Sequence, residues 1–326
     1  MNKKKVVIPE HIDESGMKIL RDCPFIETVY FDGAASDDEL REALKDAHAV
    51  MVRSAGISGE TLRNSPNLEL IAKHGVGYEK VDVAAASKRK IPVTITPGAN
   101  SNAVAELTVG FILALSRKLV IADQDLKTGR FEKREVYTAF ELGGKTVGII
   151  GLGRIGTRVA RRVAIGFGMT VIAYDPFISM DYMKSLNVEP VDAIDDLLHT
   201  SDYVTIHAPL TPLTQNMIDE RELQLMKREA FIINTARSDI INEKALFKAL
   251  SEGWINGAAL DVFEFEPPSP DNTPLLSLDN VIAAPHLGSG SREATRNMAV
   301  GAAEEIVRVL GGKRPTYPVN PEIYND

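Results

Sequence analysis

The chain has 326 residues, a length that suits two domains. Of these residues 44% are hydrophobic and 25% charged, a composition typical of a folded protein rather than a disordered chain. The formal net charge of −8 disfavours a nucleic-acid partner, because such partners are bound by basic surfaces. No apolar stretch reaches the roughly 20 residues that span a bilayer, so we expect no membrane segment.

The start of the chain and its cysteine content indicate a cytoplasmic protein. Lys3–Lys5 leads directly into Val6–Ile8, without the longer apolar region and cleavage site of a signal peptide. Cys23 is the single cysteine, which excludes internal disulfides and a cysteine-based zinc cluster. Four further histidines show no spacing typical of metal ligands: His11, His48, His74 and His199. We expect no metal ion.

Short apolar runs alternate with amphipathic stretches over the first hundred residues. The runs predict strands at Val6–Ile8, Glu27–Phe31, Ala49–Val52, Leu70–Ala72 and Val93–Ile95. Asp38–Leu44 and Val83–Arg89 predict helices between them. This alternation predicts βαβ units and a parallel sheet.

The same rhythm restarts at residue 146 and predicts a second α/β domain. Its predicted strands are Thr146–Ile150, Thr170–Tyr174, Tyr203–Ile206, Phe231–Asn234, Ala258–Val262 and Val281–Ala284. Long helical patterns at Ser101–Ser116 and Ser291–Leu310 join the two halves. The economical topology has one domain at residues 1–100 plus 290–326, into which a second domain at residues 101–289 is inserted.

A glycine-rich turn between two predicted strands has the features that a dinucleotide demands. In Gly151-Leu152-Gly153-Arg154-Ile155-Gly156, Gly151 permits the tight turn, Gly153 lets the backbone approach a pyrophosphate, and Gly156 lets the helix pack on the strand. Asp175 closes the next strand, where a carboxylate accepts hydrogen bonds from the ribose hydroxyls and repels the 2′-phosphate of NADP. The turn therefore predicts an NAD site.

Three charged side chains follow the late predicted strands. Arg237, Glu266 and His286 come after Phe231–Asn234, Ala258–Val262 and Val281–Ala284. Open parallel sheets bind ligands beyond these strand ends. Hydride transfer to a 2-keto acid requires a proton donor for the carbonyl oxygen and a cation for the carboxylate, and this set contains both.

The chain resembles the NAD-dependent D-2-hydroxyacid dehydrogenase family over nearly its whole length. The resemblance rests on Gly151–Gly156, His207–Thr211, Asn234–Arg237, Leu260–Pro267 and Pro285–Ser289. It implies two doubly wound parallel-sheet domains, a Rossmann NAD domain inserted into a flavodoxin-like substrate domain, with the catalytic cleft between them.

The resemblance also implies roles for the charged residues. His286 is expected to be the acid/base, Glu266 to orient it and stabilise its imidazolium, and Arg237 to bind and polarise the substrate. Taken singly, each has a structural explanation as a core histidine, a surface carboxylate or a solvated arginine. A departure is Ser238, which replaces a frequent glycine after the arginine.

Further residues are implied to contact the cofactor. Arg154 and Ile155 would offer backbone N–H groups to the pyrophosphate, and Asp261 a carboxylate to the nicotinamide amide. The remaining candidates would line the nicotinamide ribose, the adenosine wall and the loop after the acid/base: Thr235, Ala236, His207, Pro209 and Gly288. His207 has no obvious proton to transfer, so a structural role is favoured there.

Two segments of the first domain are implied to bind substrate. Gly75-Val76-Gly77 resembles the family's substrate-carboxylate loop, although Glu79-Lys80 stands where Asp-Asn is common, and an ordinary turn is the alternative. Asn100 either helps to organise the cleft or is a plain turn residue.

Arg53, in the setting Val52-Arg53-Ser54, matches an arginine that grips the substrate phosphate in phosphoglycerate dehydrogenases of the family. A strand-end arginine paired with a local carboxylate is the alternative. Possible substrates are therefore 3-phosphoglycerate, hydroxypyruvate, glyoxylate or a bulkier 2-keto acid. Since the sequence ends at Asp326, we expect no regulatory domain for feedback by serine.

The long segment Leu119–Glu141 mixes apolar residues with many charges. It suits an arm exchanged between subunits, so we expect a homodimer through the NAD domain, with an unpartnered surface excursion as the alternative. Another class of function is an NAD(H)-sensing, corepressor-like binding protein on the same fold. A formate-dehydrogenase-like enzyme is disfavoured, because such relatives carry glutamine where Glu266 stands.

Overall fold

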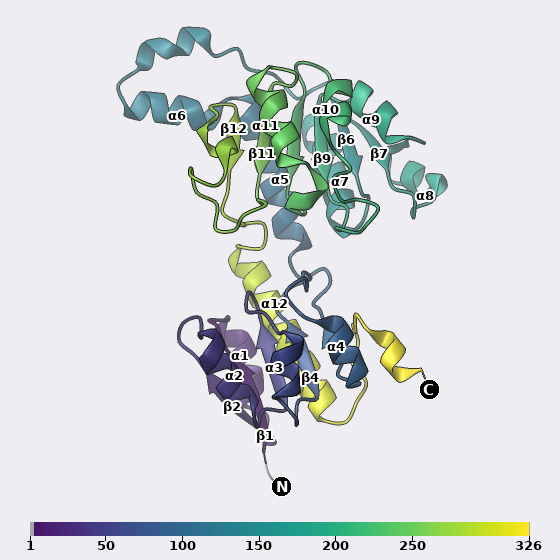
Figure 1. Ribbon diagram of the computed structural model, residues 1–326. Helices are drawn as coiled ribbons and strands as arrows, with labels where there is room; N and C mark the ends of the chain where they lie inside the picture. The colour runs from purple at the N-terminus through teal and green to yellow at the C-terminus, as the bar shows by residue number, and fades with distance from the viewer. Residues whose placement is uncertain (1–2, 326) are drawn as a thin grey trace. The chain divides into compact units, whose positions relative to one another are not determined.

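The computed structural model describes residues 3–325. The chain divides into two compact units, which Figure 1 shows with their helices and strands labelled. Unit 1 comprises Met1–Asn100 and Ser291–Asp326, and unit 2 comprises Ser101–Gly290. One continuous stretch of chain therefore forms unit 2, whereas unit 1 is assembled from both ends of the sequence.

Unit 1 is built on a five-stranded sheet in the order β2-β1-β3-β4-β5. Its named strands pair only in parallel, and the register sets Val6 opposite Ala49 and Ala49 opposite Leu70. The strands are β1 (Lys4–Ile8), β2 (Ile26–Tyr30), β3 (Ala49–Val52), β4 (Leu70–Lys73) and β5 (Val93–Thr94).

Alternate side chains of these strands pack on the two faces of the sheet, as the two-residue period of a strand requires. Val6 and Ile8 pack beneath helices α1 (Glu14–Arg21) and α12 (Arg292–Leu310). Val7 faces the opposite side, where it joins the core beneath α2 (Asp37–Leu44), α3 (Gly59–Arg63) and α4 (Val83–Lys88).

Unit 2 is built on a seven-stranded parallel sheet in the order β12-β11-β10-β9-β6-β7-β8. The chain starts this sheet in its interior at β6, extends it to one side through β7 and β8, and then crosses back to β9. The strands are β6 (Thr146–Ile150), β7 (Thr170–Tyr174), β8 (Glu189–Pro190), β9 (Tyr203–Ile206), β10 (Phe231–Asn234), β11 (Gly257–Leu260) and β12 (Val281–Ala283). This reversal beside β6 is the point where open α/β sheets bind ligands.

Helices cover both faces of the second sheet, so both units have the predicted α/β layers. One core lies beneath α5 (Ser101–Ser116) and α7 (Arg154–Phe167). The other lies beneath α9 (Ile194–Thr200), α10 (Glu220–Leu225) and α11 (Glu243–Ser251), and the short α8 (Met180–Ser185) follows β7.

The prediction of two parallel-sheet α/β domains is confirmed, with corrections to individual elements. The predicted strand Ala258–Val262 is Gly257–Leu260, so Asp261 lies just beyond the strand end. The sequence pattern also missed β8, which has only two residues, one of them a proline.

The segment after α5 extends away from the second sheet (Figure 1). It forms α6 (Leu119–Lys127) and a 3-10 turn, η1 (Phe131–Val136). The buried Asp125 carboxylate accepts hydrogen bonds from Tyr137 Oη and from Arg130, whose Nε lies 2.7 Å away. Hydrogen bonds to one buried carboxylate therefore connect α6 to the residues that follow it. Among the described residues, no helix combines the length and apolarity needed to cross a membrane.

Candidate functional site

The glycine turn after β6 needs glycine at two positions for steric reasons. Gly151 has a φ of +91°, and a Cβ there would lie 2.7 Å from the backbone nitrogen of Ala208. A Cβ on Gly156 would lie 2.2 Å from the carbonyl oxygen of Gly151. A Cβ on Gly153, in contrast, would meet no atom within 4 Å. Gly153 therefore borders open space that a ligand can occupy.

The N-terminus of α7 presents unused donors to this space. Gly153 is the N-cap and supplies no side-chain cap, and the first backbone bond of the helix runs from Thr157 N–H to Gly153 O, at 3.0 Å. Within the described residues, the N–H groups of Arg154 and Ile155 have no acceptor. Free N–H groups at a 14-residue helix form an anion site, and they fit a pyrophosphate.

Asp175, at the end of β7, lies against the same turn. Its Oδ2 accepts a hydrogen bond from Leu152 N–H at 2.8 Å, and its Oδ1 accepts one from Phe177 N–H at 2.9 Å. Each carboxylate oxygen has a second lone pair, so Asp175 can also accept hydrogen bonds from ribose hydroxyls. These residues fit a dinucleotide cofactor.

The turn after β10 is organised by Asn234, a residue to which the sequence interpretation gave no role. Asn234 is 1% exposed; its Nδ2 donates to Arg237 O at 2.8 Å, and its Oδ1 accepts from Ala236 N–H at 3.0 Å. The Thr235 hydroxyl lies 3.1 Å from that of Thr108, and Arg237 Nη1 donates to Ala236 O. The Asn234 side-chain amide therefore holds the backbone of Ala236 and Arg237, two of the candidates that follow it.

His286 and Glu266 form the predicted pair. The two Glu266 carboxylate oxygens lie 3.1 and 3.2 Å from His286 Nδ1. A carboxylate only accepts hydrogen bonds, so Nδ1 carries the proton of this bond and Nε2 remains for chemistry. The ring is half exposed, which leaves it accessible to a small molecule.

The backbone of His286 is in the left-handed region, with a φ of +54°. Asp261 holds the loop, because its carboxylate accepts hydrogen bonds from Leu287 N–H at 2.6 Å and Gly288 N–H at 2.7 Å. Burial raises the pKa of Asp261, and these two bonds counteract the rise. A Cβ on Gly288 would lie 2.9 Å from Asp261 Oδ2, which gives Gly288 a packing reason beside its predicted cofactor role.

His207, after β9, is held in its neutral form. Its Nε2 bonds the Thr205 hydroxyl, its Nδ1 is buried without a partner among the described residues, and burial lowers its pKa to about 3. This favours the structural role. Pro209, two residues further on, is exposed beside the same strand end.

In unit 1, the Gly75–Gly77 loop follows β4. Gly75 has a φ of +124°, its N–H donates to the Thr96 hydroxyl at 3.0 Å, and its carbonyl accepts from Thr96 N–H. Within the part of the chain that the structure describes, the N–H groups of Val76 and Gly77 have no acceptor. An anion cradle here would consist of those two groups. Asn100 directly precedes α5, at the boundary between the units.

Arg53, after β3, has an exposed side chain. Its guanidinium makes no ion pair or hydrogen bond with any residue in the described range 3–325. The alternative explanation, a pairing with a local carboxylate, is therefore not observed.

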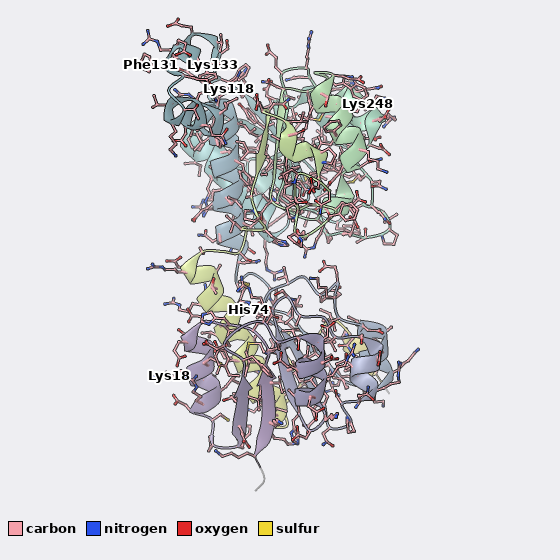
Figure 2. All side chains as sticks on the ribbon, turned by 60° about the vertical axis from the view of Figure 1, so that its left-hand side comes forward. Lys18, His74, Lys118, Phe131, Lys133 and Lys248 are labelled. Carbon is pink, nitrogen blue, oxygen red and sulfur yellow. The ribbon has the colours of Figure 1, made fainter. Side chains whose placement is uncertain are left out.

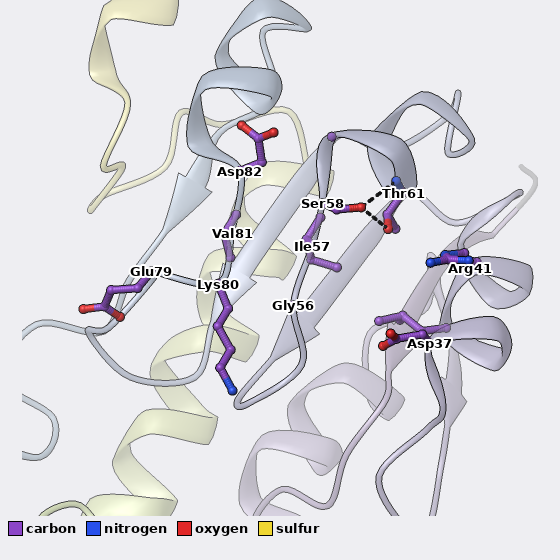
Figure 3. Close-up of a pocket in the computed structure, with 12 residues that line it drawn as sticks. Asp37, Arg41, Gly56, Ile57, Ser58, Thr61, Glu79, Lys80, Val81 and Asp82 are labelled. Atoms are coloured by element: carbon purple, nitrogen blue, oxygen red, sulfur yellow. Dashed lines mark hydrogen bonds between the residues drawn. The ribbon is translucent and has the colours of Figure 1, made fainter. Parts of the chain in front are cut away.

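A hollow of about 430 Å³ in unit 1 contains none of the predicted site residues (Figure 3). It is lined by exposed polar side chains such as Ser58, Lys80 and Asp82, and by the buried Ile57 and Val81. Among the described residues, no group of three or more His, Cys, Asp or Glu side chains gathers as a metal site would require.

The predicted residues thus lie in two sets. The cofactor and catalytic candidates follow β6, β7, β9, β10, β11 and β12 at one edge of the unit 2 sheet, because parallel strands all end at the same edge. The substrate candidates Arg53 and Gly75–Gly77 follow β3 and β4 in unit 1.

The chain is similar to known proteins in sequence and in structure. Residues 109–288 match the model of the D-isomer specific 2-hydroxyacid dehydrogenase, NAD binding domain. A D-3-phosphoglycerate dehydrogenase of Methanocaldococcus jannaschii is 42% identical over 97% of this chain and 59% of its own length. This chain therefore spans little more than half of that relative.

Two further proteins match over nearly their whole length. A glyoxylate reductase of Thermofilum pendens is 42% identical over 99% of this chain and 96% of its own. The crystal structure of an NADPH-dependent glyoxylate/hydroxypyruvate reductase of Sinorhizobium meliloti has a TM-score of 0.83 and 28% identity, with 97% of this chain and 98% of that chain covered.

Fold, site and relatives define the class of protein: a nicotinamide-dependent oxidoreductase fold with a histidine–glutamate pair beyond the strand ends. The chain belongs to the D-isomer specific 2-hydroxyacid dehydrogenase family and binds a nicotinamide cofactor.

Proposed function

We propose that this protein interconverts a small D-2-hydroxy acid and its 2-keto acid by hydride transfer, with NAD as the cofactor. The observation that carries the proposal is the His286–Glu266 pair, with Nδ1 3.1 and 3.2 Å from the carboxylate oxygens, at the same sheet edge as the glycine turn. An acid/base and a dinucleotide site are the two parts that this chemistry requires.

The bound cofactor supplies or accepts the hydride. The Arg154 and Ile155 N–H groups are assigned to the pyrophosphate, and Asp175 to the ribose, where its charge favours NAD over NADP. Thr235, Ala236, Asp261 and Gly288 are assigned to the nicotinamide side, and His207 and Pro209 to the adenosine wall.

The proton moves at His286 Nε2. During reduction, this atom gives its proton to the carbonyl oxygen of the keto acid as that carbon is reduced; during oxidation, it takes the proton from the hydroxyl group. The Glu266 carboxylate stabilises the imidazolium through Nδ1–H. Arg237 polarises the carbonyl and binds the carboxylate with its planar fork.

The substrate range follows from the remaining candidates. In the Gly75–Gly77 loop, the N–H groups of Val76 and Gly77 are assigned to the substrate carboxylate, and Gly75, whose N–H donates to Thr96, to the shape of the loop. Asn100 is a further substrate candidate. The Arg53 guanidinium, which has no partner among the described residues, is assigned to a second anionic group, which 3-phosphoglycerate has and glyoxylate lacks. Relatives named for either activity support both as candidates, and a structural neighbour named as a glyoxylate/hydroxypyruvate reductase supports hydroxypyruvate.

We also propose a cytoplasmic homodimer formed through unit 2. Leu119, Leu126, Phe131 and Val136 are 54%, 62%, 61% and 66% exposed, an unusual density of apolar surface on one short segment. Figure 2 labels Phe131 on this segment.

The test is a screen of NADH and NADPH oxidation with glyoxylate, hydroxypyruvate, phosphohydroxypyruvate and a bulkier 2-keto acid. We expect turnover with at least one acid, a preference for NADH, and loss of most of the rate in His286→Ala with cofactor affinity retained. Tight NADH binding without turnover of any acid would instead favour the sensing protein.

A further inference from the structure

A single carboxylate takes up the backbone donors of the turn that carries Arg53. Glu10 Oε1 accepts hydrogen bonds from Arg53 N–H at 3.0 Å, Ser54 N–H at 2.8 Å and Ala55 N–H at 2.8 Å. Glu10 Oε2 accepts from the Ser54 hydroxyl and lies 3.0 Å from Ser54 N. Three successive N–H groups that converge on one anion form a backbone nest.

Glu10 reaches this nest from the connection between β1 and α1, and it is only 7% exposed. Burial alone raises the pKa of its carboxyl, but the hydrogen bonds from Ser54, Ala55 and Arg53 outweigh burial and lower it. The carboxylate is therefore ionised at neutral pH. It fills a nest beyond the end of β3, on the side where open parallel sheets bind ligands.

A buried lysine binds the carbonyl group of Arg53. Lys73, at the end of β4, is 8% exposed, and its Nζ donates to the carbonyl oxygen of Arg53. The N–H and the C=O of Arg53 are thus both bound by buried charged side chains. The guanidinium, in contrast, is exposed and free of partners among the described residues.

We propose that Glu10 is a positioning residue that fixes the backbone of Arg53, so that the guanidinium is directed to bind a second anionic group on the substrate. This rests on the role proposed above for Arg53. Because Glu10 occupies the nest, such a group can be bound here only by the Arg53 side chain and not by the backbone. By positioning Arg53, Glu10 increases the affinity for substrates with a second anionic group and leaves the affinity for simple 2-keto acids unchanged.

The test compares Glu10→Gln, Arg53→Ala and the double variant in the full-length protein, with phosphohydroxypyruvate and glyoxylate as substrates. Glutamine keeps the size of the side chain but loses the charge and turns an N–H₂ group toward the nest. We expect KM for phosphohydroxypyruvate to rise about tenfold in Glu10→Gln, the effect of losing charge-assisted hydrogen bonds, with kcat and KM for glyoxylate within about twofold. In the Arg53→Ala background, Glu10→Gln should add nothing.

Glu305→Gln is the matched control, since Glu305 is a 5% exposed carboxylate of the same unit that accepts from Thr316 N–H at 2.7 Å, away from the Arg53 turn. It should leave the ratio of the two KM values unchanged. Hydrogen exchange of the amides of residues 53–55 is the second readout. It should be faster in Glu10→Gln than in the parent protein and unchanged in the control Glu305→Gln. If Glu10→Gln does not fold, Glu10→Asp is compared in the same assays.

The outcomes separate the two proposals. If Arg53→Ala leaves the ratio of KM values unchanged, the role of Arg53 fails. If Arg53→Ala changes the ratio but the Glu10 variant does not, or if the effects of the two substitutions simply add, Glu10 does not act through Arg53 and this inference is overturned.

Discussion

His286 performs its proposed chemistry from a backbone conformation that residues other than glycine rarely adopt. Its φ of +54° costs free energy, and the Asp261 carboxylate stabilises the loop through the next two N–H groups. Asp261 thus fixes the direction of the ring indirectly, and Glu266 fixes it directly. Two carboxylates with different environments therefore support one imidazole.

The buried His74 makes the stability of the protein depend on pH. It is 4% exposed, and neither ring nitrogen has a hydrogen-bond partner among the described residues. Figure 2 labels it in unit 1. Burial, reinforced by the charge of Arg53, lowers its pKa to about 4, from the ordinary value of 6.5. Since the unfolded chain binds this proton more readily, acidification below pH 6.5 favours unfolding until His74 itself is protonated near pH 4.

His74→Phe should therefore flatten the acid side of the stability curve. Phenylalanine keeps the ring and removes two unsatisfied nitrogens, so we expect little change at pH 7.5. Between pH 7 and pH 5 the variant should retain about 2 kcal/mol that the parent loses. Urea unfolding at several pH values measures this. The exposed His11→Phe is the control, and an unchanged slope in His74→Phe would contradict the neutral assignment.

At the scale of elements, the β6–α7 turn separates glycines that fold the chain from a glycine that faces ligand. Gly156→Ala would place a methyl group 2.2 Å from Gly151 O, whereas Gly153→Ala places it in open space. We expect Gly156→Ala to lower the free energy of unfolding by several kcal/mol, as overpacking against backbone does. Gly153→Ala should keep the parent's stability and weaken NADH binding at least about tenfold.

Thermal unfolding and NADH fluorescence titration measure the two effects. Gly166→Ala is the control, because a Cβ there also meets nothing within 4 Å and the residue lies on α7 far from its N-terminus. Parent-like NADH affinity in Gly153→Ala would show that the pyrophosphate is not held at this turn.

The strands and the glycine turn were predictable because both depend on local patterns: apolar runs and required glycines. The hydrogen bonds that polar side chains make around these elements could not be predicted from the sequence. Glu10 and Arg53 are separated by 43 residues, and no periodicity links a residue after β1 to a turn after β3. Asn234 was visible within its motif, but its role depends on the turn geometry. Glu266 and His286 could be singled out as charged residues after the late strands, but the roles expected of them came from the family resemblance.

At the scale of the whole molecule, the exposed segment after α5 predicts self-association. A groove of about 300 Å³ lies beside it in unit 2, with Leu115, Val120 and Ile121 in its lining. We expect light scattering to give twice the chain mass of 35.6 kDa. The double variant Phe131→Ser/Val136→Ser should shift the mass toward the monomer, because it removes exposed apolar side chains from the segment.

Leu213→Ser is the control, since Leu213 is 84% exposed on unit 2 outside the segment. A parent protein of single-chain mass at micromolar concentration would refute the dimer.

The insertion of unit 2 also has a consequence for synthesis on the ribosome. The strands of unit 1 are complete at Thr94, but α12, which supplies Ala299, Ala302 and Ile306 to one face of that sheet, ends at Leu310. Roughly 200 residues are added in between, which takes about 10–40 s at common elongation rates. Throughout this interval Val6, Ile8 and Leu70 lack part of their cover. Unit 1, whose strands are made first, is therefore completed last, and its nascent sheet exposes apolar side chains in the meantime.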